Sequence, residues 1–320
     1  LAAVRLRLRE NQVLVSYHLG AERSLVWVVT QEGASLHALP GRDAITEMVA
    51  RFRTAIETNP ADFEEAGSRL YRSLLKPVSG PLAGKKHLLL LPDDVLFELP
   101  FAALRESAQS PYLIERFVIE LLPGAWAVEQ QDRRLAWSGP FLGVGDPVYN
   151  PADERRPRKS FPASIWQAKA AASASLTLPR LPGTASELGA CARRVGLEKP
   201  ELLLGLEARW ERVRARLASE PGIIHFATHV VPSPDSPRES LLALSLRPNG
   251  EPELLTSELI AAHDVRSRLV VLSGCRSGSG NIKPGEGLMG LTRAWLLAGA
   301  QSVLATYWPT LDDTDRKSVV

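Results

Sequence analysis

Residues 269–278 read Leu-Val-Val-Leu-Ser-Gly-Cys-Arg-Ser-Gly, a run of leucine and β-branched residues that ends abruptly in Ser-Gly and delivers Cys275. A short apolar run bounded by turn residues is typical of a strand buried in a parallel sheet. In open α/β sheets, ligands and chemistry collect at the carboxyl ends of the strands. The stretch therefore predicts a buried strand with a thiol at its tip, and Cys275 is the first candidate nucleophile.

A second stretch has the same build, because residues 222–229 read Gly-Ile-Ile-His-Phe-Ala-Thr-His. If the two strands lie near one another in a parallel sheet, His229 and Cys275 emerge at the same edge. A thiol becomes a good nucleophile only when a nearby base removes its proton. We therefore expect His229 to activate Cys275. The alternative is that Cys275 is a small buried hydrophobic residue, and its place at a strand end favours the functional interpretation.

The order of predicted elements indicates an α/β protein with two lobes. After Phe141, strands alternate with helices, which is typical of a mostly parallel sheet covered by helices. The first part begins with a strand hairpin over 12–30, continues with helices, and offers no nucleophile with a nearby base. We expect residues 1–135 to form a non-catalytic N-terminal lobe and residues 136–320 a catalytic lobe.

Two further segments carry predictions. Small residues within 285–299 predict a helix that packs closely on the sheet, and the low-complexity stretch over 151–180 predicts a long exposed loop. Asp146 follows a buried strand and a glycine turn, where it either lines the active-site edge or caps the turn. Gly143-Val-Gly145 lacks the third glycine of a dinucleotide loop, since Val148 stands there, and we reject a nucleotide site.

Composition excludes several classes. The 320 residues are 45% hydrophobic and 23% charged, a composition that is ordinary for a globular protein. The net charge of +2 is too small to imply nucleic acid or an anionic membrane as the main partner. Only two cysteines occur, so we expect no disulfide framework and a cytoplasmic location. No apolar run approaches the roughly 20 residues of a membrane span. The chain opens on Leu1 and stops at 317–320, where an apolar helix is expected to start, and we expect it to be a piece of a longer polypeptide.

A metal site is a minor alternative. His225 and His229 are four residues apart, but the metalloprotease pattern requires a helix and a glutamate after the first histidine, and Phe226 stands there in a strand-like context. We expect His225 either to support His229 from the same face or to be a satisfied core histidine. A regulatory metal site built from His225, His229 and Cys275 remains a third interpretation, and Cys191 on a helix is expected to be structural.

Five blocks of sequence, in this order, carry a family resemblance. They are His-Phe-Ala-Thr-His at 225–229, Val-Val-Leu-Ser-Gly-Cys at 270–275, Gly-Glu-Gly-Leu-Met-Gly-Leu-Thr-Arg-Ala at 285–294, Ala-Gly-Ala-Gln-Ser-Val at 298–303, and Tyr-Trp-Pro with Asp-Asp at 307–313. The chain resembles a CHAT domain, a caspase-like cysteine peptidase module related to separase and often found behind tetratricopeptide repeats. The resemblance implies a caspase-like three-layer sandwich, with a mostly parallel sheet covered by helices on both faces and an N-terminal α/β lobe.

The resemblance also implies roles for individual residues. His229 would be the general base and Cys275 the nucleophile of an endopeptidase that works through a thioester acyl-enzyme. The oxyanion would be held by the backbone N–H groups of Val230 and Cys275. The family usually has glycine where this chain has Val230, and alanine where it has Gly274. A β-branched residue does not easily adopt a positive φ, so the oxyanion hole is expected to be shaped differently or the domain to be degenerate.

Substrates and partners follow from the same resemblance. By this resemblance, Asp312 matches an acidic residue of the specificity pocket and would receive a basic P1 side chain. Asp146, from its place at the strand-end turn, would also contact substrate. We expect a protein or peptide substrate, control by an upstream tetratricopeptide-repeat region or a partner, and no cofactor, metal, nucleic acid or membrane. The main alternative is a catalytically degenerate scaffold for protein–protein interaction. A weaker hypothesis makes the 151–180 loop a processing segment, since its basic run would suit an arginine-preferring enzyme.

Overall fold

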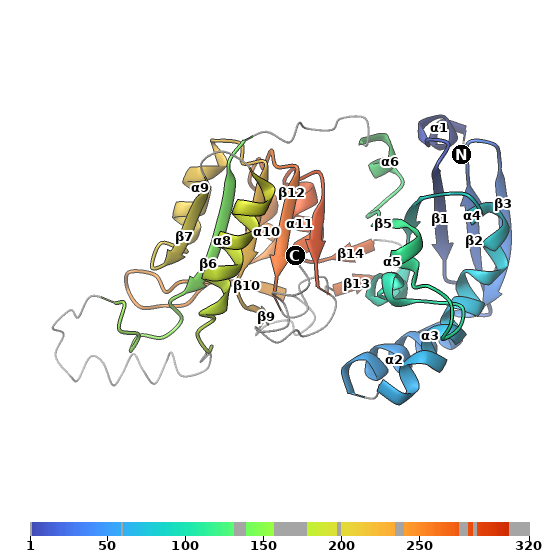
Figure 1. Ribbon diagram of the computed structural model, residues 1–320, viewed down its shortest axis with the longest axis horizontal. Helices are drawn as coiled ribbons and strands as arrows, with labels where there is room; N and C mark the ends of the chain where they lie inside the picture. The colour runs from blue at the N-terminus through green and yellow to red at the C-terminus, as the bar shows by residue number, and fades with distance from the viewer. Residues whose placement is uncertain are drawn as a thin grey trace. The chain divides into compact units, whose positions relative to one another are not determined.

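The computed structural model describes residues 2–58, 60–130, 139–156, 178–196, 200–233, 240–274, 281–283 and 287–306 (Figure 1). The chain divides into two compact units. Unit 1 comprises residues 1–133 and 281–289, and unit 2 comprises residues 134–280 and 290–320. The sequence predicts a boundary after residue 135, and the assignment of catalysis to one lobe stays a prediction.

Unit 1 is built on a five-stranded sheet of order β3-β2-β1-β4-β5. The strands are β1 Gln12–His18, β2 Arg23–Val29, β3 Ala34–Pro40, β4 His87–Leu91 and β5 Val118–Leu121. The predicted hairpin is confirmed, since β1 pairs antiparallel with β2, and β3 extends it. β4 and β5 then add in parallel, so the sheet is mixed.

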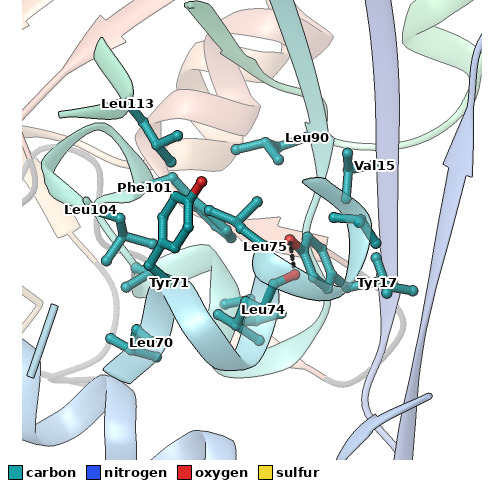
Figure 2. Close-up of a cluster of buried hydrophobic side chains, with 14 of the residues drawn as sticks. Val15, Tyr17, Leu70, Tyr71, Leu74, Leu75, Leu90, Phe101, Leu104 and Leu113 are labelled. Atoms are coloured by element: carbon teal, nitrogen blue, oxygen red, sulfur yellow. Dashed lines mark hydrogen bonds between the residues drawn. The ribbon is translucent and has the colours of Figure 1, made fainter. Parts of the chain in front are cut away.

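Helices complete this unit and bury its core. They are α1 Ala2–Arg7, α2 Arg42–Thr58, α3 Pro60–Leu74, α4 Ser79–Leu82, α5 Leu113–Arg116 and α6 Trp126–Gln130, with one-turn 3₁₀ segments η1 Lys76–Val78, η2 Asp94–Glu98 and η3 Phe101–Ala103. Figure 2 shows the core, where Leu74 and Leu75 from the end of α3 lie near Tyr17 of β1 and Leu90 of β4. The Tyr17 hydroxyl donates to the carbonyl oxygen of Leu74 at 3.3 Å, which satisfies the one polar atom of that buried ring.

A short antiparallel hairpin from late in the chain also belongs to unit 1. Strands β13 Asn281–Lys283 and β14 Gly287–Met289 pair with each other, and both contact η2. The predicted helix over 285–299 is therefore wrong at residues 287–289, and the helix begins only at Leu291. Glycine is a poor helix former, and Gly290 adopts φ 158° and ψ −166°, a conformation that is essentially restricted to glycine.

Unit 2 contains the predicted parallel sheet, of order β15-β12-β8-β6-β7. Its strands are β6 Phe141–Pro147, β7 Glu201–Gly205, β8 Ile223–Ala227, β12 Leu269–Ser273 and β15 Val303–Ala305. Every neighbouring pair is parallel, and β8 and β12 are adjacent with Ala227 opposite Ser273. The first five residues of β6 and the five residues of β8 are all buried, and each is apolar, a glycine or a histidine. This is expected for strands that are covered on both faces.

Helices cover both faces of this sheet. Helices α9 Trp210–Leu217, α10 Ser257–Ala261 and α11 Leu291–Leu297 share one core with Ile224 and Phe226 of β8. Helix α8 Gly183–Val195 packs on the opposite face against Ile223 and Ala227. Side chains alternate between the faces of a strand, and this alternation turns His225 toward α8. The expected sandwich with helices on both faces is confirmed.

A second, three-stranded sheet lies beyond the end of β8 in sequence. It has the order β11-β10-β9 and consists of β9 Val230–Pro232, β10 Ser240–Leu244 and β11 Glu253–Leu255. Its strands pair antiparallel, with Val230 opposite Leu242. Residues 228 and 229 therefore join two sheets.

Among the helices of the described ranges, none combines the length and apolarity that a membrane crossing requires.

Candidate active site

His229 stands between β8 and β9 and is held by two groups. Its backbone N–H donates to the Tyr149 hydroxyl at 3.1 Å, and the two rings pack with centroids 5.1 Å apart. Its Nε2 lies 2.9 Å from the carbonyl oxygen of Pro179. A carbonyl oxygen only accepts hydrogen bonds, so Nε2 carries the proton. In the neutral ring, Nδ1 is then the nitrogen free to accept a proton.

Tyr149 is a fixed support for this histidine. Burial raises the pKa of the Tyr149 phenol well above its ordinary value, although the hydrogen bond from His229 partly opposes that shift. The phenol therefore stays neutral over the whole physiological range. It offers His229 a rigid aromatic face together with an acceptor oxygen.

Cys275 lies outside the described residues, and the chain is described up to Gly274, directly before it. The register that places Ser273 opposite Ala227 brings Gly274 beside Thr228. A Cβ atom on Gly274 would lie 2.6 Å from the carbonyl oxygen of Thr228, closer than real Cβ contacts allow. The tip of β12 therefore runs against the backbone that flanks His229, and only glycine allows this approach.

The backbone of Val230 has an ordinary strand conformation. Val230 is not among the non-glycine residues with positive φ in the described ranges, which are Asp94, Asp146 and Glu220. The N–H of Ala243 donates to the carbonyl of His229 at 2.9 Å. Because hydrogen-bonded and non-hydrogen-bonded pairs alternate along an antiparallel ladder, the N–H of Val230 points away from β10.

His225 is a core histidine rather than a neighbour of His229 on one face. It is 1% exposed, and its Nε2 lies 2.9 Å from Oγ of Ser273 and 3.0 Å from Oε1 of Glu187. The network joins β8, β12 and α8 directly below the strand tips. Since β8 ends at Ala227, strand alternation does not continue to His229, and the two histidines bind different partners. Among the described residues, no group of three His, Cys, Asp or Glu side chains could hold a metal ion.

Asp146 is the penultimate residue of β6, has a left-handed backbone with φ 43°, and is 7% exposed. Arg180 donates Nε to Oδ1 and Nη2 to Oδ2, both at 2.9 Å. Arg155 reaches Oδ2 with Nη1 at 2.9 Å and also binds the carboxylate of Asp153. The hydrogen bonds from Arg155 lower the pKa of Asp153 to about 2.

Some predicted residues fall elsewhere. Asp312 and residues 157–177 of the predicted loop lie outside the described residues. Cys191 is half-buried on α8, where desolvation and then the charge of Glu187 raise its thiol pKa. Pro179, Arg180 and Tyr149 were not anticipated from the sequence, because they reach the site through contacts between segments 30 to 80 residues apart and follow no local pattern.

A parallel sheet covered by helices on both faces, with a histidine just beyond the carboxyl end of a central strand, is consistent with a caspase-like α/β sandwich. The CHAT domain model matches residues 64–317, and the chain belongs to the CHAT domain family. Tetratricopeptide repeat protein 28 of Mus musculus is 28% identical over 291 residues, which cover 75% of this chain and 11% of that protein. The Homo sapiens protein of the same name is 27% identical over 284 residues, with the same two coverages. This chain thus spans about a tenth of the length of these relatives.

Proposed function

We propose that the chain is a cysteine endopeptidase with His229 as general base and Cys275 as nucleophile. The observation that carries the proposal is the contact between Nε2 of His229 and the Pro179 carbonyl, because it leaves Nδ1 as the proton acceptor. Cys275 follows Gly274 in the sequence, one trans peptide of about 3.8 Å further along the chain. Gly274 in turn packs on Thr228, the residue before His229. These two facts support a thiol within reach of the imidazole.

The reaction would proceed by acyl transfer. The proton of the Cys275 thiol passes to Nδ1 of His229, and the sulfur attacks the carbonyl carbon of the scissile peptide bond. The imidazolium then gives that proton to the leaving amine, which releases the amine product and leaves a thioester. Water, deprotonated by His229, hydrolyses the thioester and regenerates the thiol.

The oxyanion of this reaction would be bound by backbone N–H groups of Val230 and Cys275. The direction of the Val230 N–H, away from β10, supports this role, since it is not used in the ladder. The valine does not require a strained backbone, because its φ lies outside the positive region. Val230 in the usual place of glycine is nevertheless the feature that favours the second candidate, a scaffold without turnover.

Labelling with a peptidyl acyloxymethyl ketone separates the two candidates. The experiment uses a Cys191→Ser background, so that Cys275 is the only thiol. The peptidase predicts stoichiometric labelling that is lost in His229→Ala. His263→Ala is the matched control, since His263 is a half-buried histidine of the same unit that binds the Leu259 carbonyl. Labelling that is absent, or that is equal in wild type and His229→Ala, would exclude the peptidase and leave the scaffold.

Substrate preference rests on the family resemblance. Asp312 is proposed to receive a basic P1 side chain through charge-assisted hydrogen bonds. Fluorogenic peptides with Arg, Leu or Asp at P1 test this, and equal turnover of all three removes the idea. Asp146 is proposed to act in the same site, and its two arginine partners support an indirect role rather than a free carboxylate.

The setting of the domain is proposed from its relatives. Both relatives carry tetratricopeptide repeat in their names and extend far beyond the matched region. We propose that a repeat region accompanies this domain in a cytoplasmic protein and controls it. A cut within the 151–180 segment remains a subsidiary proposal, and mass spectrometry of incubated wild type against Cys275→Ala tests it.

A further inference from the structure

The end of β6 carries a charged cluster whose members are almost fully engaged with one another. Asp146 binds Arg180 and Arg155, and Arg155 also binds Asp153, so two carboxylates balance two guanidinium groups. The carboxylate of Asp146 meets Arg180 through two parallel hydrogen bonds of 2.9 Å. Such a fork fixes the relative orientation of two segments as well as their separation.

The segment fixed in this way is the one that touches His229. Arg180 immediately follows Pro179, and the Pro179 carbonyl belongs to the peptide group that joins these two residues. That carbonyl oxygen accepts the hydrogen bond from Nε2 of His229 at 2.9 Å. Any shift of Arg180 by an ångström therefore displaces the acceptor of the imidazole by a similar distance.

A second anchor holds the next residue. The Thr184 hydroxyl donates to the carbonyl of Leu181 at 2.7 Å and accepts from the backbone N–H of Asp146 at 2.8 Å. The segment 179–181 is therefore tied to the end of β6 twice, through the side chain of Asp146 and through its backbone. Both ties converge on one residue.

The backbone of Asp146 supports a role beyond stability. Its left-handed conformation at φ 43° costs free energy, and strained residues persist where the surrounding contacts require them. Arg180 is 47% exposed, whereas the Asp146 carboxylate is only 9% exposed and is held by the two parallel hydrogen bonds of the fork. A strained residue whose carboxylate is held at two points is best explained by the orientation that the pair imposes.

We propose that Asp146 and Arg180 are positioning residues, which hold the Pro179 carbonyl against Nε2 of His229 and so fix the ring with Nδ1 unprotonated and turned toward the nucleophile. The proposal rests on the assignment of His229 as the general base. In this proposal, Asp146 acts on His229 through Arg180 and the Pro179 carbonyl and does not contact the substrate directly. The residues themselves touch neither substrate nor reacting atoms.

The test measures the imidazole directly. Protein labelled with ¹⁵N-histidine is compared as wild type, Arg180→Ala and Arg180→Lys, and His229→Gln assigns the signals among the six histidines. In wild type, the neutral His229 ring is expected to show one tautomer, protonated at Nε2. Arg180→Ala is expected to show averaged nitrogen shifts of both tautomers, and Arg180→Lys an intermediate position, because lysine keeps the charge but loses the fork.

The same variants are assayed for alkylation of Cys275 by iodoacetamide in the Cys191→Ser background. Arg180→Ala is expected to slow alkylation about tenfold to a hundredfold, the range for misplacing a reacting group by about 1 Å. Arg216→Ala is the matched control, since Arg216 has a similar exposure of 43% and pairs with Glu201 elsewhere in unit 2. The control is expected to leave both measurements unchanged.

Two outcomes overturn the proposal. Nitrogen shifts of His229 that are the same in wild type and Arg180→Ala exclude the positioning role, even if hydrolysis slows. A change of equal size in Arg216→Ala assigns the effect to charge in general. If the shifts move as expected but no peptide is cleaved, the positioning role stands and only the peptidase function fails.

Discussion

A Cβ atom built on Gly274 would lie 3.0 Å from Cγ2 of Val230, so the small residue at the tip of β12 makes room for the large residue after His229. Val230 and Gly274 are two of the positions near the proposed site at which the sequence departs from the pattern that the family resemblance implies. Their contact shows that the departures are complementary in volume. Val230 is therefore compatible with an ordered site, and it is not by itself a sign of collapse.

This complementarity predicts coupling between the two positions. Gly274→Ala alone is expected to destabilise the protein by about 1–3 kcal/mol, the usual cost of overpacking. In a Val230→Gly background the same change is expected to cost less, because one of its two close contacts is gone, while the contact with the Thr228 carbonyl remains. Urea unfolding of the four proteins of a double-mutant cycle gives the coupling free energy. Strict additivity would show that the residues do not share space.

The buried network below the strand tips predicts a large loss of stability when its acid is removed. Glu187→Ala removes the carboxylate that lies 3.0 Å from Nε2 of the buried His225 and leaves that nitrogen with the Ser273 hydroxyl as its neighbour, and we expect a loss of about 1–3 kcal/mol. Denaturant unfolding measures it. Glu211→Ala, at an exposed position on α9, serves as control and is expected to change stability by less than about 0.5 kcal/mol. Similar values for the two variants would contradict the network.

Removing the hydroxyl of Tyr149 tests the support of His229. Tyr149→Phe keeps the ring packing but deprives the His229 backbone N–H of its acceptor, and we expect a loss of about 1 kcal/mol together with slower alkylation of Cys275. Tyr112→Phe controls for loss of a phenol in unit 1 and is expected to leave alkylation unchanged. An unchanged alkylation rate in Tyr149→Phe would show that this hydrogen bond does not help to place the imidazole.

The ion pair of Asp153 predicts an acid-dependent effect. Its pKa in the folded protein is lowered to about 2 from an ordinary 3.8, so its stabilising contribution is fully present above pH 4 and is lost as the pH falls toward 2. Asp153→Asn should therefore lower Tm at pH 6 but have a diminishing effect between pH 4 and 2. A difference in Tm that stays constant down to pH 2 would rule out this titration.

The sequence predicted those parts of the fold that follow a local pattern. The apolar runs at β6, β8 and β12 and the alternation after Phe141 were enough to predict a parallel sheet with its tips at one edge. The hairpin β13–β14 was missed because small residues are compatible both with close helix packing and with an extended backbone. The positive φ of Gly290, which precedes the helix, cannot be recognised from the pattern of hydrophobic residues.

The candidate site was predictable only where side-chain chemistry marks it. His229 could be identified because a histidine ends an apolar strand. The groups that orient it could not, because Pro179 acts through its backbone carbonyl, which every residue possesses, and Arg180 is one of many arginines until the fold brings it to Asp146. Only the packing of α8 on β8 reveals the place of Glu187 beside His225.

The pKa of the Cys275 thiol tests the central claim most directly, because an imidazole within reach lowers it and a distant one does not. Thiolate absorbance is followed across pH in the Cys191→Ser background, with and without His229→Ala. The account predicts a pKa well below the ordinary value of about 8.5 when His229 is present, and a rise toward that value or beyond when it is removed. Identical titration of the two proteins would contradict it.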